Sequence, residues 1–174
     1  MSDKSLHLTG RERTFDPDQI IVSKTDLKGR ITYVNDIFLE VSGYTESEAM
    51  GQAHSIVRHP ETPRCLFQLM WENLDKDREI FVYINNRAKN GDFYWVLAHV
   101  TPTYNLKGEK VGYHSNRRVP RREPIKMLQP LYDRLLQEER RHSDRKTGQQ
   151  AAYAMLMDVL KQEGKPYAEF VLGL

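Results

Sequence analysis

Residues 79–119 read EIFVYINNRAKNGDFYWVLAHVTPTYNLKGEKVGYHSNRRV, and this stretch decides the fold class. β-Branched and aromatic residues dominate it, as they do in strands. Asn90-Gly91 is the strongest hairpin signal in the sequence, because both residues tolerate positive φ, and Asn105–Gly108 marks a second turn. We therefore expect an antiparallel meander of three strands, over residues 79–89, 92–103 and 109–119.

A shorter pair of strands and several helices are predicted upstream of the meander. Ile20–Val22 and Ile31–Val34 flank a turn at Gly29 and predict a hairpin. Short helices follow, and the longest is expected to begin at Pro63 and to end near Asp77. Strands and helices in separate blocks are typical of the α+β class, so we expect one antiparallel sheet with helices over one face and a cleft between the two layers.

The segments on either side of residues 20–120 have a different character. Residues 1–19 are polar and show no periodicity, which predicts a mobile N-terminal arm. Residues 121–174 carry apolar residues at helical spacing, which predicts an extension of two amphipathic helices and a short third one. A polar break at 142–146 separates the first two, and Thr147 has the spacing of a capping box at the start of the second.

The apolar stripes of this C-terminal helical extension need a partner. The first stripe contains four leucines, whose burial is worth roughly 6–10 kcal/mol in total: Leu128, Leu131, Leu135 and Leu136. Because a helical hairpin alone buries only part of such a surface, we expect a homodimer whose interface includes these helices. The alternative is that the helices pack on their own domain.

Composition and motifs exclude several classes of protein. The chain has 174 residues, a formal net charge of +2 and one cysteine, Cys65, which excludes an internal disulfide framework and favours a reducing compartment. No apolar run is long enough to span a membrane and the N-terminus lacks a signal-peptide pattern, so we expect a cytoplasmic protein. The absence of nucleophile-elbow, phosphate-loop and zinc-protease motifs argues against an enzyme. The arginines between 117 and 122 lack interleaved aromatic residues, so no nucleic-acid partner is expected.

A series of short motifs resembles one protein family. In chain order they are Val34-Asn35-Asp36, Val41-Ser42-Gly43-Tyr44, Gly51-Gln52, Val57-Arg58-His59-Pro60, Trp71, Asn86-Arg87, Lys89-Asn90-Gly91-Asp92 and Tyr94-Trp95-Val96. Together they resemble a PAS domain over residues 20–120, and in particular the N-terminal sensory PAS domain of bacterial aerotaxis receptors. The resemblance implies a five-stranded antiparallel sheet flanked by short helices. It also implies a bound FAD whose redox state is relayed to a signalling partner, such as a chemoreceptor or a kinase.

Residue types within these motifs suggest groups that would bind a cofactor. Arg58 suits an anion such as phosphate through its fork of donors, and His59 would orient a bound ring. The amides of Asn35 and Asn86 can hydrogen-bond the edge of a heterocycle. Each has a structural alternative: a capping loop for Arg58 and His59, a helix N-cap for Asn35 and a polar position on the sheet for Asn86.

Aromatic and histidine side chains add further candidates. Trp71 and Trp95 can stack on a flat cofactor, although core packing is the more frequent role of tryptophan. His54 or His59 could ligate haem, whereas the spacing of His54, His59 and Cys65 fits no standard zinc pattern.

One strand departs from the aerotaxis receptors. They typically carry a Pro-Trp-x-Gly run where this chain has Glu79-Ile80-Phe81-Val82. Ile80 and Val82 share a strand face with Asn86, so we expect them to narrow the pocket. Three interpretations remain open: a sensor with FAD or a related flavin, a PAS adaptor or dimerisation module without a cofactor, and a haem-binding sensor.

Overall fold

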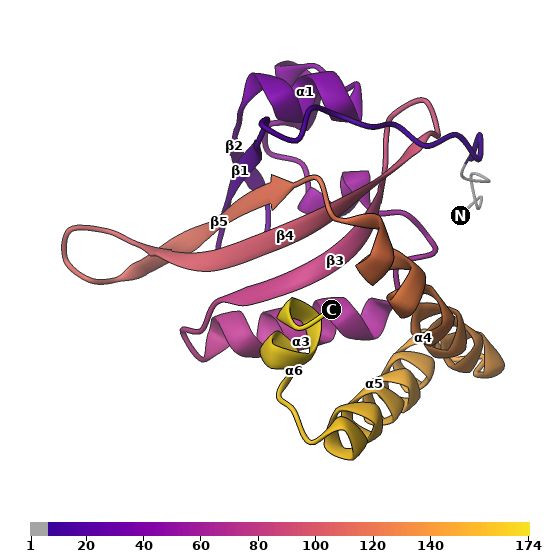
Figure 1. The fold of residues 1–174 in the computed structure, drawn as a ribbon. Helices are drawn as coiled ribbons and strands as arrows, with labels where there is room; N and C mark the ends of the chain where they lie inside the picture. The colour runs from indigo at the N-terminus through magenta and orange to yellow at the C-terminus, as the bar shows by residue number, and fades with distance from the viewer. Residues whose placement is uncertain (1–6) are drawn as a thin grey trace.

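A five-stranded antiparallel sheet forms the centre of the protein, which is described here from a computed structural model covering residues 7–174 (Figure 1). The strand order is β2-β1-β5-β4-β3. The strands are β1 (Ile21–Asp26), β2 (Ile31–Val34), β3 (Ile80–Arg87), β4 (Phe93–Tyr104) and β5 (Lys110–Arg118). The α+β class and the sheet predicted from the sequence are confirmed.

The first group of helices lies between β2 and β3 in the chain. It comprises α1 (Asp36–Ser42), α2 (Glu46–Ala49), the 3-10 turn η1 (His54–Val57) and α3 (Arg64–Asp75). Local signals explain these boundaries. Asn35 caps α1 by accepting from the Phe38 N–H at 3.1 Å, and Gly43 ends the helix at φ 74°, where a side chain would be strained. Thr45 and Glu48 form a capping box at α2.

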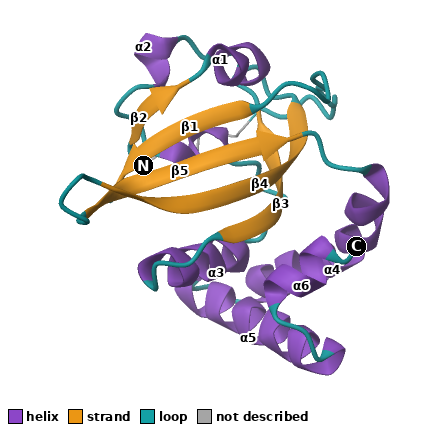
Figure 2. Cartoon of the chain, turned by 60° about the vertical axis from the view of Figure 1, so that its left-hand side comes forward, coloured by secondary structure: helices purple, strands orange, loops and turns teal. Residues whose placement is uncertain are grey.

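Strand register decides which side chains share a face of the sheet. Asn86 pairs with Tyr94, Val82 with Ala98, and Ala98 with Arg117 on β5, so these residues lie on one face. Tyr83 and Trp95 belong to the opposite face. Figure 2 shows α1 and α2 beside β1 and β2, and the C-terminal helices beside the β3 edge.

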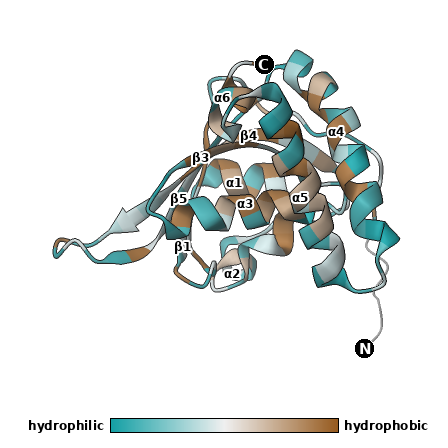
Figure 3. Ribbon diagram, turned by 90° about the horizontal axis from the view of Figure 1, so that it is seen from below, coloured by the Kyte–Doolittle hydropathy of each residue, from teal (hydrophilic) through white to brown (hydrophobic). Residues whose placement is uncertain are grey.

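The C-terminal extension wraps around the edge strand β3. Its helices are α4 (Arg122–Arg141), α5 (Arg145–Glu163) and α6 (Tyr167–Leu172). Along α4, apolar and polar residues alternate as in an amphipathic helix (Figure 3). Leu128 and Leu135 are 1% and 0% exposed within this single chain, and the Tyr132 hydroxyl donates to the Tyr83 carbonyl of β3 at 2.7 Å. Most of the apolar stripe is covered within this single chain, by α5 and the sheet domain, so the stripe does not require a second copy.

The start of α5 differs from the sequence-based expectation. Asp144, not Thr147, is the N-cap, and its carboxylate accepts from the Thr147 N–H at 2.7 Å. Aspartate is among the strongest N-cap residues, so it sets the start three residues earlier. The polar break therefore shortens to residues 142–144.

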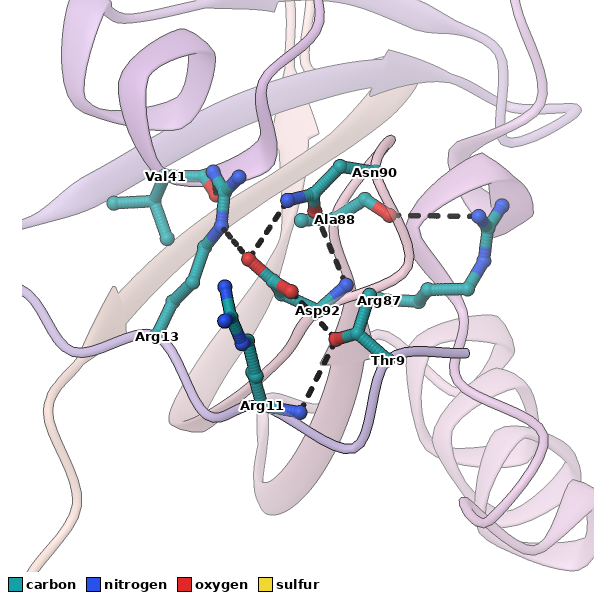
Figure 4. Close-up of polar contacts among 8 residues, drawn as sticks. All are labelled: Thr9, Arg11, Arg13, Val41, Arg87, Ala88, Asn90 and Asp92. Atoms are coloured by element: carbon teal, nitrogen blue, oxygen red, sulfur yellow. Dashed lines mark hydrogen bonds and ion pairs between the residues drawn. The ribbon is translucent and has the colours of Figure 1, made fainter. Parts of the chain in front are cut away.

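The N-terminal arm has fixed contacts over residues 9–13 and contains no helix between residues 7 and 19. The Thr9 N–H donates to the Gly91 carbonyl at 3.0 Å and the Arg13 N–H to the Phe93 carbonyl at 2.7 Å, while the Phe93 N–H donates to the Arg11 carbonyl at 2.9 Å. Figure 4 shows the Thr9 and Arg13 side chains on the Asp92 carboxylate. The expectation of a mobile arm is wrong for this segment, and its first six residues lie outside the described part of the chain.

Candidate ligand-binding cavity

A cavity of about 300 Å3 lies between the sheet, α3 and the turn η1. This volume is at the lower end of the roughly 300–1,000 Å3 that ligand sites span. Most of its wall is apolar or aromatic, from Val57, Phe67, Met70, Trp71, Leu74, Ile84, Ala98, Val100 and Tyr113. Polar groups come from the sheet and from η1, which gives the mixture of apolar walls and a few polar groups that is typical of ligand sites.

Two rings form one wall of the cavity. Trp71 of α3 and Tyr113 of β5 meet edge to face with their centroids 5.2 Å apart. The Trp71 side chain remains 36% exposed, although it lies against the turn at Gly29. A tryptophan that keeps this much surface beside a cavity can cover a flat ligand. Trp71 lines the cavity, and its stacking on a ligand stays a prediction.

Arg58 and Asn86 lie together at the cavity, where they form an isolated backbone bridge. The Arg58 guanidinium lies 4.7 Å from the Phe67 ring centroid and donates to the Thr62 carbonyl at 3.3 Å. Burial, followed by the charge of Arg64, lowers the pKa of Arg58 to about 10, so it remains a cation at neutral pH. Asn86 is buried and offers an amide donor and acceptor at the cavity wall.

His54 forms a buried polar group with two residues of the sheet. Its Nε2 lies 3.0 Å from the Ser23 Oγ and 2.6 Å from the Arg117 Nη2. A guanidinium only donates, so the His54 Nε2 must accept and the ring is neutral. Burial, and then the charge of Arg117, lowers the pKa of His54 to about 3.

Arg117 is the cavity residue that sequence reasoning missed. In the sequence, Arg117 stands in a basic run that suggests only a charged surface, but the register of β5 pairs it with Ala98 on the cavity face. The side chain is 3% exposed, and burial lowers its pKa to about 10. Alternation along β5 was the available signal, because Tyr113, Ser115 and Arg117 share one face.

Five predicted cofactor-binding residues lie outside the cavity lining, and the first three are Asn35, His59 and Trp95. Asn35 accepts from the Val22 and Phe38 N–H groups and donates to the Ile20 carbonyl, so its amide holds α1 to β1. His59 is 4% exposed, and its Nδ1 accepts from the Glu61 N–H at 3.2 Å. Trp95 lies on the opposite face of the sheet, where its ring packs 6.1 Å from that of Tyr132. Stacking of Trp95 on a ligand in this cavity is therefore wrong, because the sheet lies between them.

Ile80 and Val82 are buried on the same face of β3 as Asn86, as strand alternation predicts. Neither lines the cavity. The inference that they narrow the pocket is not supported.

The described residues give little support for a metal or haem ligand. Within residues 7–174, no group of three or more histidine, cysteine, aspartate or glutamate side chains could hold a metal ion. His54 is the histidine that lines the cavity, and its Nε2 is engaged by Ser23 and Arg117. Cys65 is buried away from the lining, and burial raises the pKa of its thiol to about 12.

The face of α3 that turns away from the cavity is tied to the C-terminal extension. The Glu139 carboxylate of α4 accepts from the Cys65 N–H at 3.0 Å, at a helix start where Pro63 supplies no side-chain cap. Two residues of α5 continue this contact, since Gln149 donates to Gln68 and Tyr153 donates to Glu72. α3 therefore lies between the cavity and the extension. None of the helices described is both long and apolar enough to cross a membrane.

Comparisons of sequence agree with this architecture. Residues 31–117 match the family model described as PAS fold. The chain is 40% identical to the aerotaxis receptor of Escherichia coli over 129 residues, which is 74% of this chain and 25% of the receptor. It is 31% identical to the nitrogen fixation regulatory protein of Klebsiella pneumoniae over 94 residues, which is 54% of this chain and 19% of that protein. The chain thus spans a quarter or less of the length of these relatives.

Solved structures show the same fold. A PAS domain from Colwellia psychrerythraea has a TM-score of 0.53 at 21% identity and covers 58% of this chain and 86% of its own. A light-oxygen-voltage domain studied with a flavin analogue has a TM-score of 0.56 at 20% identity, with coverage of 66% and 86%. With the family match over half of the sequence, these findings show that the chain belongs to the PAS-fold family.

Proposed function

We propose that this chain is a cytoplasmic sensory domain that binds FAD or a related flavin and reports its redox state to a signalling partner. The observation that carries the proposal is the cavity itself. Its lining combines the Trp71 and Tyr113 rings with polar groups from the sheet, in a chain 40% identical to an aerotaxis receptor over 129 residues. A flavin, when bound, supplies a flat ring whose charge and protonation change with its redox state.

The residues present fit such a ring. Trp71 would cover one ring face, while Asn86 and Ser115 would offer hydrogen bonds from the sheet. A structural cue also favours an occupied cavity, because the Arg117 Nη1 is buried and has no hydrogen-bond partner among the described residues.

The relay would run through α3. Phe67, Met70 and Trp71 on its cavity side would respond to a change in the ligand. At its start, the Cys65–Glu139 hydrogen bond transmits a shift of the helix to α4. A switch requires that the ligand interact differently with two arrangements, and a ring that changes charge does so.

Purification of the full chain tests the ligand. We expect a yellow protein with the absorption bands of an oxidised flavin, which is released on denaturation and identified by chromatography against FAD and FMN standards. Asn86→Ala should lower the flavin content, whereas Asn105→Ala in the exposed β4–β5 turn should leave it unchanged. A colourless chain that also fails to bind added FAD, FMN and riboflavin would overturn the proposal.

Hydrogen exchange tests the relay. Between the oxidised protein and the same sample reduced with dithionite, we expect changed protection at the Cys65 amide and in the first half of α3. Glu139→Ala should abolish the accompanying change in α4. Identical exchange in α4 of the wild-type chain in both states would contradict a route through this contact.

We also propose a homodimer, although the apolar stripes of the C-terminal extension do not require one. The apolar stripes of α4 and α5 are largely covered within the chain, so a dimer interface would use other surfaces. Light scattering of the full chain measures the stoichiometry. A monomer at high concentration would contradict the dimer and leave the sensor proposal standing.

A further inference from the structure

We propose that Arg117 is the anion-binding residue of the cavity, and that the ligand presents to it an edge carrying negative charge or carbonyl oxygens. The inference rests on the proposed function only in requiring that a ligand enter the cavity. It names the chemistry of that ligand and the residue that selects it.

The first observation is the position of the guanidinium. Arg117 is 3% exposed on the cavity face of β5. Its Nη2 is used within the fold, since it donates to the Ser23 Oγ at 2.5 Å and to the His54 Nε2 at 2.6 Å. Its Nη1 is also buried and finds no acceptor within residues 7–174. A buried donor without an acceptor is costly, so a ligand acceptor at this nitrogen would remove an existing penalty.

The second observation is the missing counter-charge. Among the residues that the structure describes, three cationic side chains line the cavity, Lys28, Arg58 and Arg117, and no aspartate or glutamate does. A buried arginine is normally paired with a carboxylate, because an uncompensated charge in a medium of low polarity is strongly unfavourable. The fold thus keeps a positive cavity wall that its own residues do not neutralise.

The groups that face Arg117 are neutral. His54 accepts from it and is uncharged, as argued above. Tyr94 lies buried on the same sheet face, and burial raises the pKa of its hydroxyl, so it does not become an anion near neutral pH. The Phe38 ring lies 5.8 Å from the guanidinium carbon and offers only its π face. Within residues 7–174 no anionic side chain faces the guanidinium, so a ligand would supply its negative partner.

Guanidinium geometry narrows the ligand class. The planar fork of donors fits a planar pair of acceptors, as in a carboxylate, an imide edge or a phosphate. In a flavin this chemistry has two sources, namely the carbonyl edge of the ring and the phosphate of FMN or FAD. Because the Trp71 and Tyr113 rings line the same cavity and suit a flat ring, we assign the planar edge to Arg117.

The test compares three variants of the full chain. Arg117→Met keeps the length and removes the charge, and Arg117→Lys keeps the charge and removes the fork. Arg118→Met is the matched control, because Arg118 is the next residue of β5 and points to the exposed face. Dissociation constants are measured with riboflavin, FMN and FAD on apoprotein, and the thermal midpoint of each apoprotein is recorded.

We expect Arg117→Met to weaken riboflavin and FMN binding alike, by at least about tenfold, as loss of a charged hydrogen bond implies. The dissociation constants of Arg117→Lys should lie between those of the wild type and Arg117→Met, and those of Arg118→Met should stay within about twofold of the wild type. The apoprotein of Arg117→Met should melt no lower than the wild type, since an uncompensated buried charge has been removed. Weakening of FMN and FAD only would move the anion to the phosphate and contradict the ring-edge assignment.

The remaining outcomes separate this inference from the proposed function. Wild-type affinity in Arg117→Met would overturn the role of Arg117 and leave the flavin proposal intact. If the Arg117→Met apoprotein is destabilised and Arg117→Lys binds flavin with wild-type affinity, then Arg117 has a structural role. If the wild-type chain binds no flavin, the flavin proposal fails. Benzoate then becomes the probe, and the inference stands only if benzoate raises the thermal midpoint of the wild type and not of Arg117→Met.

Discussion

The two faces of the sheet are closed in different ways. On one face, a cavity lined by three cations and a neutral histidine separates the sheet from α3. On the other, α6 packs on β3, and Tyr132 of α4 packs directly against Trp95 of β4. Adjacent residues of one strand, such as Tyr94 and Trp95, therefore belong to surfaces with different demands.

This difference assigns separate roles to the two faces. Close packing on the helix-covered face supplies stability, because side chains such as Trp95 and Tyr132 are buried against each other there. The cavity face carries the orphaned nitrogen of Arg117, which costs stability until a ligand compensates it. Local conflicts of this kind are expected where a protein binds a ligand. Truncation of a buried side chain on the helix-covered face should therefore lower stability, whereas removal of the Arg117 charge on the cavity face should not.

The largest effect is expected from a cavity made on the packed face. Leu135 of α4 is 0% exposed, and Leu135→Ala should lower the free energy of unfolding by about 3 kcal/mol, within the range of buried leucine truncations. Leu172→Ala on the exposed side of α6 should cost less than about 0.5 kcal/mol. Urea unfolding of both variants measures the difference. Equal, small losses would show that α4 is not docked on the domain.

The next effect comes from the cavity face and depends on pH. His54 has a folded pKa of about 3, against about 6.5 in an unfolded chain. Below pH 6.5 the unfolded chain takes up a proton that the folded chain refuses, so stability is greatest above that value and is lost as the pH falls toward 3. Between pH 7 and 5 the apoprotein should lose about 2 kcal/mol through this group.

His54→Gln isolates that contribution, because an amide can still accept from Ser23 and Arg117 but does not titrate. The variant should be less sensitive to pH over the same interval by nearly the same amount. His114→Gln, a half-buried histidine outside the cavity lining, is the control and should follow the wild type. Unfolding curves at each pH provide the comparison, and parallel behaviour of His54→Gln and wild type would mean that His54 is protonated in the folded state.

Much of the sheet could be predicted because its signals are local. Asn90-Gly91 specifies a hairpin, and alternation specifies the strand faces whatever surrounds them. The sequence does not say which face is covered by which helix, since that depends on contacts between distant segments. Trp95, which the sequence suggests as a cofactor-binding residue, therefore lies on the side away from the cavity, whereas Asn86 on the other face of the meander lines the cavity.

The electrostatic part of the site could not be predicted for a related reason. Arg117 and Arg118 are identical as letters, yet one is buried at the cavity and the other is exposed. Alternation along β5 puts them on opposite faces, but only the pairing of β5 with β1 and β4 shows which face borders the cavity. The same holds for Glu139, whose role at the start of α3 requires the extension to fold back over the β3 edge.

A smaller effect on stability is expected at the contact between Glu139 of α4 and the start of α3. Glu139→Ala removes the acceptor of the Cys65 N–H and should cost about 1 kcal/mol, as loss of a helix N-cap does. Glu139→Gln keeps an acceptor and should recover much of this loss. Glu163→Ala, at the exposed end of α5, is the control for removal of a carboxylate. Chemical denaturation of the three variants ranks them, and an effect of Glu163→Ala as large as that of Glu139→Ala would contradict the capping role.

The smallest effect is expected at the N-terminal arm, where Thr9 and Arg13 bind Asp92 in the β3–β4 hairpin (Figure 4). Hydrogen bonds from Thr9, Asn90 and Arg13 lower the pKa of Asp92 to about 2, below the value of about 3.9 in an unfolded chain. The stabilisation is therefore present above pH 4 and is lost as the pH falls toward 2. Asp92→Asn should mimic this loss at neutral pH, because an amide pairs poorly with the Arg13 guanidinium. Hydrogen exchange at the Arg13 and Phe93 amides should then accelerate, while the global unfolding midpoint moves little. Asp18→Asn, an exposed change on the same arm, should alter neither quantity, and unchanged exchange in Asp92→Asn would show that the backbone bonds alone hold the arm.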